Sequence, residues 1–489
     1  MGDLEFLPAL GWPLDVVVLG LHLVVTPDST RKVTMPPTDQ ASFATIAPAP
    51  HEIWAGFRRP TPDWLRRSRL GIFIHWGAYS VPAWAEPSGA LGTVSDREWF
   101  AHNAYAEWYG NTMRIPGSPT ALRHQEVYGD APYDAFLDQW TARDFDPDAW
   151  AELFADAGAG FVVPTTKHHD GIALWDAPGT GTRNTVHRGP HRDLVGEIAT
   201  AVRAHGMHFG VYYSGGLDWS VTTFGPHTSH DDVSALRPRD AAYNMYAVSH
   251  VRDLMERYQP DVLWNDINWP DAGKRTGPWS LHELLSDFYA GNPDGVVNDR
   301  WGDTHWDFRT SEYEAGTDLE VGDTWEQCRG IGLSFGYNQV EGTDQYLDGR
   351  ALARLLGDIV SRGGRLLLNV GPTADGQIVA PQQEALRGLG RWMRVARELL
   401  ASSVPVAEDV AAASDDPWVR WLETPSHLVA LVDHDGPVTL AHRHDAAVAG
   451  AAVSGAGATV TGQSEGRVEV TMASPGDGPA VVLLPKRRR

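Results

Sequence analysis

Between residues 50 and 398, stretches with apolar residues three and four positions apart alternate with short, almost wholly apolar runs. The spaced stretches predict amphipathic helices, and the short runs predict strands buried on both faces. The predicted helices cover 145–158, 193–206, 243–259, 280–291, 350–364 and 384–400. The predicted strands cover 69–77, 160–171, 208–216, 261–266, 295–301 and 365–372.

This alternation is typical of α/β proteins, and the span of about 350 residues predicts a (β/α)₈-like, TIM-type catalytic barrel. A doubly wound sheet is the alternative, but no glycine-rich phosphate loop follows any predicted strand. Beyond residue 398 the pattern changes to short alternating runs separated by Gly, Pro, Asp and Ser, which predicts a C-terminal antiparallel β-sandwich over 399–489.

Residues 1–49 fit neither domain, and we interpret them as an N-terminal tail with Met35 as an alternative start. The apolar stretch at 9–25 is broken by Pro13, Asp15 and His22, and no basic residue precedes it. It is short for a membrane span and does not follow the pattern of a secretory signal. We therefore expect a cytoplasmic protein.

Composition excludes several classes of function. The formal net charge of −23 argues against binding to nucleic acids or anionic membranes. The single cysteine, Cys328, rules out a disulfide framework. The chain also contains 20 Trp and 20 His. More than half of the Trp residues are expected in the core, and the rest offer flat apolar faces suited to stacking on sugar rings.

Polar, aromatic and titratable residues gather where the predicted strands end. In a barrel these strand ends face one common opening, where active sites lie. Six such clusters are difficult to attribute to packing alone. They are His75-Trp76, His168-His169-Asp170, Tyr212-Tyr213, Trp264-Asn265-Asp266, Asn298-Asp299-Arg300-Trp301 and Glu312-Tyr313-Glu314.

Two chemistries could use these residues. A metal site could draw on His75, His168, His169 and Asp266, although neighbouring residues on a strand point in opposite directions, so His168 and His169 would rarely share one ion. Glycoside hydrolysis needs two carboxyl groups beside stacking aromatic residues. Asp266 paired with Glu312 or Glu314 meets that need.

The sequence resembles the α-L-fucosidases of glycoside hydrolase family 29 from about residue 65 to about residue 400. Nine stretches match motifs of the family and follow one another in the same order as in the family. They are GIFIHWGAYSVPAW, AEWYGNTMR, TKHHDG, VYYSGGLDW, LWNDINWP, VVNDRWG, RTSEYE, RGIGLSFGYN and LLLNVGP. The resemblance implies an irregular (β/α)₈-like barrel followed by a β-sandwich. It also implies a retaining enzyme that removes terminal α-L-fucose from glycans.

The resemblance assigns roles to individual positions. It implies that Asp266 is the nucleophile and that Glu312 is the general acid/base, with Glu314 as the local alternative. Phe335 matches an aromatic residue that faces the C6 methyl group of fucose, although a purely core role is also open. Residues matching positions that contact the fucose ring or its hydroxyls are His75, Glu107, Trp108, His168, His169, Tyr212, Trp264 and Arg300.

Plain structural roles compete with two of these assignments: Asp266 could cap a loop, and Glu107 with Trp108 could merely pack at a helix start. A catalytically inactive glycan-binding protein is a second functional hypothesis, but both acids are present. An α-galactosidase is a third.

The family mechanism implies a covalent fucosyl-enzyme, which could also transfer fucose to another hydroxyl, and it needs no metal or other cofactor. We expect a fucosylated oligosaccharide or glycoconjugate as substrate and a homo-oligomeric assembly. The loops at 86–93 and 222–234 are expected to set the linkage preference.

Overall fold

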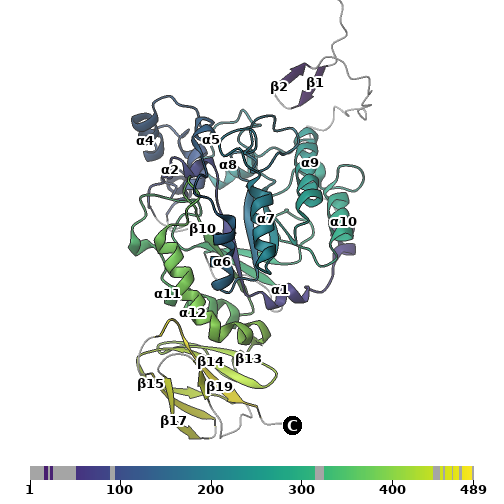
Figure 1. The fold of residues 1–489 in the computed structure, drawn as a ribbon. Coiled ribbons are helices and arrows are strands. Elements are labelled where there is room, and N and C mark those ends of the chain that lie inside the picture. The colour runs from purple at the N-terminus through teal and green to yellow at the C-terminus, as the bar shows by residue number, and fades with distance from the viewer. Residues whose placement is uncertain are drawn as a thin grey trace, which may run out of the picture.

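The computed structural model describes residues 16–19, 22–25, 51–88, 94–313, 324–443, 452–454, 458–464, 466–472 and 476–486. A sheet surrounded by helices forms the larger part of the molecule, and antiparallel strands form a smaller part at the C-terminal end (Figure 1). The predicted tail at 1–49 lies outside the described residues, except for an antiparallel pair, β1 (Val16–Leu19) and β2 (His22–Val25). Among the described helices, none has the length and hydrophobicity that a membrane span requires.

Eight parallel strands form the sheet of the larger part, in the order β7-β6-β5-β4-β3-β10-β9-β8. They are β3 (Leu70–Ile74), β4 (Phe161–Lys167), β5 (His208–Ser214), β6 (Val262–Asp266), β7 (Val296–Val297), β8 (Arg309–Glu312), β9 (Trp325–Gly330) and β10 (Arg365–Val370). The prediction of a TIM-type barrel is confirmed. Six of these strands coincide with the apolar runs in the sequence. The apolar runs predicted neither β8 nor β9, because Arg, Thr, Ser, Glu and Gln occupy most of their positions. Only the cluster Glu312-Tyr313-Glu314 indicated a strand end at β8.

The ring of strands is irregular between its two edges, β7 and β8. Here side chains replace part of the strand ladder: Asp307 Oδ2 accepts a hydrogen bond from the Val297 backbone at 2.8 Å. Asp299 Oδ1 likewise accepts from the Thr310 backbone at 3.1 Å. These carboxylates satisfy backbone donors that a regular barrel would pair between strands, so the ring closes without a continuous ladder.

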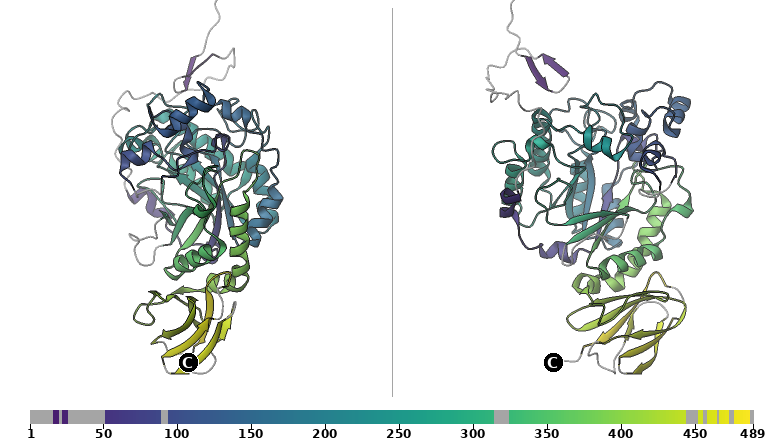
Figure 2. Two further views of the ribbon diagram at one scale, coloured as in Figure 1. Left: turned by 90° about the vertical axis from the view of Figure 1, so that its left-hand side faces the viewer. Right: turned by 180° about the vertical axis from the view of Figure 1, so that it is seen from behind.

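Helices cover the outside of the sheet (Figure 2). Several helices are preceded by an N-cap residue whose side chain accepts hydrogen bonds from free backbone N–H groups of the first turn. These N-caps include Asp146, Asp240, Ser280 and Asp348. The α-helices are α1 (Asp63–Arg67), α2 (Asp96–Ala101), α3 (Tyr109–Thr112), α4 (Pro119–Tyr128), α5 (Ala135–Gln139), α6 (Pro147–Asp156), α7 (Leu194–Ala204), α8 (His230–Ala235), α9 (Ala241–Tyr258), α10 (Leu281–Gly291), α11 (Gly349–Ser361) and α12 (Ala380–Ser402). Short 3₁₀ helices are η2 (His51–Phe57), η3 (Ala78–Ser80), η4 (Ala106–Trp108), η5 (Asp271–Gly273) and η6 (Thr343–Gln345).

The strands separate two apolar layers, because successive side chains point to opposite faces. Residues that fill the space inside the barrel include Phe73, Val163, Tyr212, Val262, Trp264 and Leu367. Residues that pack between the sheet and its helices include Ile72, Val162, Val211, Leu263, Val297 and Leu368. Since both layers are buried, the strands are apolar on both sides, which explains why the sequence shows continuous apolar runs.

The C-terminal strands form two antiparallel sheets, confirming the predicted β-sandwich. One sheet has the order β11-β13-β14-β19-β16 with β12 beside β13, and the other has the order β15-β18-β17. The strands are β11 (Val404–Pro405), β12 (Ser414–Asp415), β13 (Trp418–Glu423), β14 (His427–Asp433), β15 (Gly436–Ala441), β16 (Ala452–Ser454), β17 (Ala458–Ser464), β18 (Arg467–Met472) and β19 (Ala480–Pro485). The larger sheet also packs on the barrel: Leu431 lies against Gly357 of α11, and Trp392 Nε1 of α12 donates to Pro479 O at 2.8 Å.

A buried ion pair fixes the loops above two neighbouring strands. Lys167, the last residue of β4, places Nζ 3.1 Å from Oδ2 of Asp218, which lies in the loop after β5. Both side chains are fully buried. Replacing Asp218 with Ala leaves an uncompensated buried charge, so we expect the free energy of unfolding to fall by about 3–5 kcal/mol in urea titrations.

The matched control is Asp63→Ala, which breaks the exposed Arg66–Asp63 pair. Exposed pairs contribute little, so its loss should stay below about 1 kcal/mol. Equal losses in the two variants would show that burial does not strengthen the Lys167–Asp218 pair.

Candidate active site

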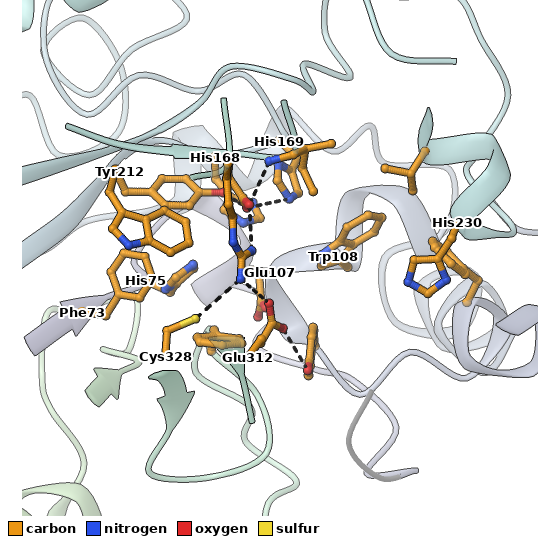
Figure 3. Close-up of a pocket in the computed structure, with 18 of the residues that line it drawn as sticks. Phe73, His75, Glu107, Trp108, His168, His169, Tyr212, His230, Glu312 and Cys328 are labelled. Atoms are coloured by element: carbon orange, nitrogen blue, oxygen red, sulfur yellow. Dashed lines mark hydrogen bonds and ion pairs between the residues drawn. The ribbon is translucent and has the colours of Figure 1, made fainter. Parts of the chain in front are cut away.

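A pocket of about 650 Å³ opens at the carboxyl ends of the barrel strands (Figure 3). All of the site residues that the sequence predicts line it: His75, Glu107, Trp108, His168, His169, Tyr212, Trp264, Asp266, Arg300, Glu312 and Phe335. The remaining lining residues were not predicted and are Phe73, Trp99, Phe100, Tyr105, His230, Val233, Ile267 and Cys328.

Asp266 ends β6 on the face that points into the barrel, two residues after Trp264. Its Oδ2 accepts a hydrogen bond from Tyr212 Oη at 2.8 Å. Its Oδ1 accepts from the Ile267 backbone at 2.9 Å and from Arg300 Nη1 at 3.0 Å. A loop cap would account for the contact with Ile267 alone. The other two contacts hold the carboxylate in the pocket.

Arg300 joins Asp266 to the second acid. Its Nη2 donates to Glu312 Oε2 at 3.1 Å, so one guanidinium contacts two carboxyl groups. Burial by itself lowers the pKa of Arg300, but the neighbouring charges, Asp266 foremost, reverse this and raise it well above its usual value. The Arg300 backbone is also fixed, because its carbonyl accepts from Asn265 Nδ2 at 2.8 Å.

Glu312 is the last residue of β8. Besides Arg300, it is contacted by Tyr105, whose Oη donates to Oε1 at 3.3 Å. Glu314, the predicted alternative to Glu312, lies outside the described residues. The residues that follow the two acids, Ile267 and Tyr313, have φ values of 68° and 56°. Left-handed backbone is costly for bulky residues and is concentrated at functional sites.

Two of the predicted histidines, His75 and His169, approach the pocket with ring orientations fixed by hydrogen bonds. His75 Nδ1 lies 2.7 Å from Asn369 Oδ1, and His169 Nδ1 lies 2.7 Å from Ser214 Oγ. Asn369 Nδ2 donates to a backbone carbonyl, and so does the Ser214 hydroxyl. Asn369 therefore presents its amide oxygen to His75 Nδ1, and Ser214 presents its hydroxyl oxygen to His169 Nδ1, so both oxygens accept hydrogen bonds. Each Nδ1 then carries the proton, and each Nε2 is left with a lone pair.

Burial keeps these histidines uncharged. It lowers the pKa of His75 to about 4 and the pKa values of His168 and His169 well below the usual range. In His168 and His169 the charges of neighbouring groups add to this effect. Neutral imidazoles donate and accept hydrogen bonds, which suits the recognition of neutral hydroxyl groups.

The expectation that His168 and His169 point in opposite directions is wrong. Both line the pocket, and their ring centroids lie 4.0 Å apart. β4 ends at Lys167, so the two histidines follow the strand and its alternation no longer applies to them. Among the residues that the structure describes, no group of three or more His, Cys, Asp or Glu side chains could hold a metal ion.

Glu107 and Trp108 belong to the 3₁₀ helix η4 and form another wall. Glu107 Oε2 accepts from the Gly336 backbone at 2.7 Å and from Ser334 Oγ at 3.3 Å. Burial raises the pKa of Glu107 to about 8, against the opposing effect of these hydrogen bonds. Trp108 meets His169 edge to face with centroids 5.2 Å apart. Both residues therefore face the pocket as well as pack.

Aromatic rings form the opposite wall. Tyr212 stacks on Trp264 with centroids 5.5 Å apart, and the guanidinium carbon of Arg300 lies 4.8 Å from the centre of the Trp264 ring. Trp264 Nε1 donates to buried Glu326 at 3.0 Å, which fixes the indole plane. The ring centroids of Phe335 and His75 lie 5.0 Å apart, and Phe335 lines the pocket, so it is not confined to the core.

Comparisons with known proteins identify the family. A model of the family described as Alpha-L-fucosidase matches residues 50–398. Tissue alpha-L-fucosidase of Bos taurus is 33% identical over 401 residues, which cover 80% of this chain and 79% of its own. The chain belongs to the α-L-fucosidase family. It is therefore a glycoside hydrolase, and α-L-fucosidase activity is the function that this family supports.

Solved structures of α-L-fucosidases share the fold. A Thermotoga maritima alpha-fucosidase in complex with fucose superposes with a TM-score of 0.74 at 40% identity, covering 87% of this chain and 97% of that chain. A Thermotoga maritima alpha-L-fucosynthase in complex with alpha-L-Fuc-(1-2)-beta-L-Fuc-N3 gives a TM-score of 0.77 at 41% identity, covering 87% of this chain and 97% of that chain. Both the barrel and the sandwich are thus within the compared region.

The sequence did not predict two lining residues whose side chains contact the charged groups at the centre of this α-L-fucosidase-family site. Tyr105 contacts Glu312, and it stands one residue before the matched stretch that begins at Ala106. Cys328 lies on β9, which the apolar pattern did not predict, with Sγ 3.7 Å from Arg300 Nη2. A prediction of β9 would have placed Cys328 on the inner face of the barrel.

The raised pKa of Glu107 predicts a specific dependence of stability on pH. In the unfolded chain this carboxyl ionises near pH 4.5, whereas in the folded protein it stays protonated up to about pH 8. The folded state binds the extra proton between these values, so this group's contribution to stability falls as the pH rises through that window. We expect the free energy of unfolding of Glu107→Gln to rise relative to that of the wild type as the pH increases from 4.5 to about 8. Urea unfolding at each pH measures this difference.

The difference in the free energy of unfolding between variant and wild type isolates the contribution of Glu107, because the other buried acids titrate equally in both proteins. A stability difference that stays constant across this pH range would contradict the raised pKa. The exposed residue Glu384 provides the control, since Glu384→Gln should show no such trend.

Proposed function

We propose that this protein is a retaining exo-α-L-fucosidase in which Asp266 is the nucleophile and Glu312 is the general acid/base. The observation that carries the proposal is the contact of both carboxyl groups with the single guanidinium of Arg300 inside the pocket. Retaining glycosidases need two carboxyl groups close together, one to attack and one to exchange a proton.

In the first step, an Asp266 oxygen bonds to the anomeric carbon as the bond from that carbon to the leaving oxygen breaks. Protonated Glu312 gives its proton to the leaving oxygen. Asp266 thereby loses its negative charge to the new ester, and Glu312 gains one. Arg300 contacts both groups, so its positive charge keeps one carboxylate partner before and after this step.

In the second step, water attacks the anomeric carbon from the side that the leaving group vacated. Glu312 takes a proton from this water, and the bond from carbon to Asp266 breaks, which restores both acids. Another hydroxyl can take the place of the water, which gives transfer of fucose. The named fucosynthase among the structural relatives supports this second outcome for the present chain.

The walls of the pocket support fucose as the sugar. Neutral His75 and His169 present ring nitrogens suited to hydroxyl groups, and a site built on such bonds discriminates against sugars that lack the matching hydroxyl. Phe73 and Phe335 form an apolar corner that suits the C6 methyl group of fucose. An α-L-galactoside, which is the α-L-fucoside with a C6 hydroxyl group, would bury that hydroxyl there without a partner, which is unfavourable.

Substitution of Asp266 tests the nucleophile. With 4-nitrophenyl α-L-fucoside as substrate, Asp266→Gly should lower kcat/KM at least about a thousand-fold, because no group remains to attack the anomeric carbon. Added azide should enter the vacated space, restore release of nitrophenol and give β-L-fucosyl azide, identified by NMR.

The control for Asp266→Gly is Asp176→Gly, which removes an exposed carboxylate paired with His187. It should retain wild-type kinetics. If Asp266→Gly keeps more than about a tenth of the wild-type activity, Asp266 is not the nucleophile.

A leaving-group comparison tests the acid/base. Nitrophenol leaves readily without protonation, whereas a sugar alcohol does not, so loss of the acid should harm disaccharide cleavage far more. We expect Glu312→Gln to reduce kcat/KM for a fucosyl disaccharide at least about ten-fold more than for the nitrophenyl substrate. Glu314→Gln should leave this ratio unchanged. The reverse pattern in the two variants would transfer the role to Glu314.

A further inference from the structure

The pocket extends beyond the ring of residues around Asp266 and Glu312. Four lining residues, Trp99, Phe100, His230 and Val233, form an outer lobe that no step of the proposed reaction uses. Trp99 and Phe100 lie on α2, and His230 and Val233 lie on α8. Figure 3 shows Trp108 between His230, which belongs to this lobe, and Glu312.

A continuous series of rings connects the outer lobe to the acid/base. Tyr105 donates to Glu312 at 3.3 Å and meets Trp99 edge to face with centroids 5.3 Å apart. Trp99 in turn lies parallel to the His230 ring, with an interplanar angle of 22° and centroids 6.1 Å apart. Packed rings therefore connect the wall of the lobe to Glu312. The leaving group departs from the side where its oxygen receives the proton of Glu312.

The two helices of the lobe are joined by one side chain. The carboxylate of Asp96, the first residue of α2, accepts from both the backbone N–H and the Nδ1 atom of His230, the first residue of α8. This contact fixes the imidazole while 60% of the side chain stays exposed. With Nδ1 bonded to Asp96, the remaining Nε2 carries a lone pair that can accept a hydrogen bond.

The other walls of the lobe are apolar. Trp99, Phe100 and Val233 are buried, and Phe100 meets the His230 ring edge to face at 5.3 Å. An apolar wall with one fixed polar group suits a sugar ring, whose apolar face packs on aromatic rings while a hydroxyl at its edge donates to a nitrogen.

Resting on the proposed function, we propose that the outer lobe binds the sugar to which fucose is linked. His230 accepts a hydroxyl of this leaving-group sugar, and Asp96 is a positioning residue that holds His230. Trp99 and Val233 pack against the sugar ring. The lobe thus favours substrates whose leaving group is a sugar over substrates whose leaving group is too small to extend beyond Glu312.

Two kinds of substrate separate binding by the lobe from the chemical step. α-L-Fucosyl fluoride carries a single-atom leaving group that cannot reach the lobe, whereas fucosylgalactose and fucosyl-N-acetylglucosamine carry a complete sugar. The measured quantity is kcat/KM for each disaccharide divided by kcat/KM for the fluoride. We expect His230→Ala to lower this ratio about ten-fold, mainly through KM, because a hydrogen bond to the leaving sugar is lost. Asp96→Asn should also lower this ratio of kcat/KM values.

The matched control is His187→Ala, which removes another exposed histidine paired with an aspartate, Asp176. It should leave the ratio as in wild type. Turnover of the fluoride shows that each variant is folded.

A ratio within two-fold of wild type in His230→Ala, or an equal loss on both kinds of substrate, would overturn the inference. A wild type that cleaves the fluoride but neither disaccharide would overturn this inference and leave the proposed fucosidase chemistry intact. A wild type that cleaves none of these substrates would overturn both.

Discussion

One guanidinium holds two carboxyl groups in a largely buried pocket, and the chemistry proposed for this protein depends on that contact. Arg300 donates to Asp266 and Glu312 from its two terminal nitrogens. Two adjacent carboxylates would repel each other, and burial would make both charges costly. The shared cation offsets both effects. It also lets negative charge pass from Asp266 to Glu312 during the reaction while the total charge around Arg300 stays constant.

The fold is arranged to keep Arg300 in place. Asn265 points away from the barrel interior, next to Asp266 in sequence, and its amide holds the Arg300 carbonyl. The Trp264 ring supports the guanidinium from the other side. Asp299 bonds to the Thr310 backbone and thereby ties the segment after β7 to β8, the strand that ends in Glu312. The irregular edge of the barrel is thus the region that sets the distance between the two acids.

Periodicity and motifs predicted most of this architecture from the sequence, since both layers around the strands are apolar. The polar strands β8 and β9 have no such signal, because Arg, Thr, Ser, Glu and Gln occupy most of their positions. The orientation of His169 depends on where β4 ends, which periodicity does not locate to one residue. Tyr105 reaches Glu312 across 207 positions in the chain, and only the folded structure brings them together.

The central claim is that Asp266 and Glu312 act as a retaining pair, and the configuration of the first product tests it most directly. Proton NMR of fucose released in the first minutes from an α-L-fucoside distinguishes the anomers before they interconvert. Two displacements at the anomeric carbon predict α-L-fucose as the initial product. Initial release of β-L-fucose would show a single displacement by water, and Asp266 could not then be the nucleophile.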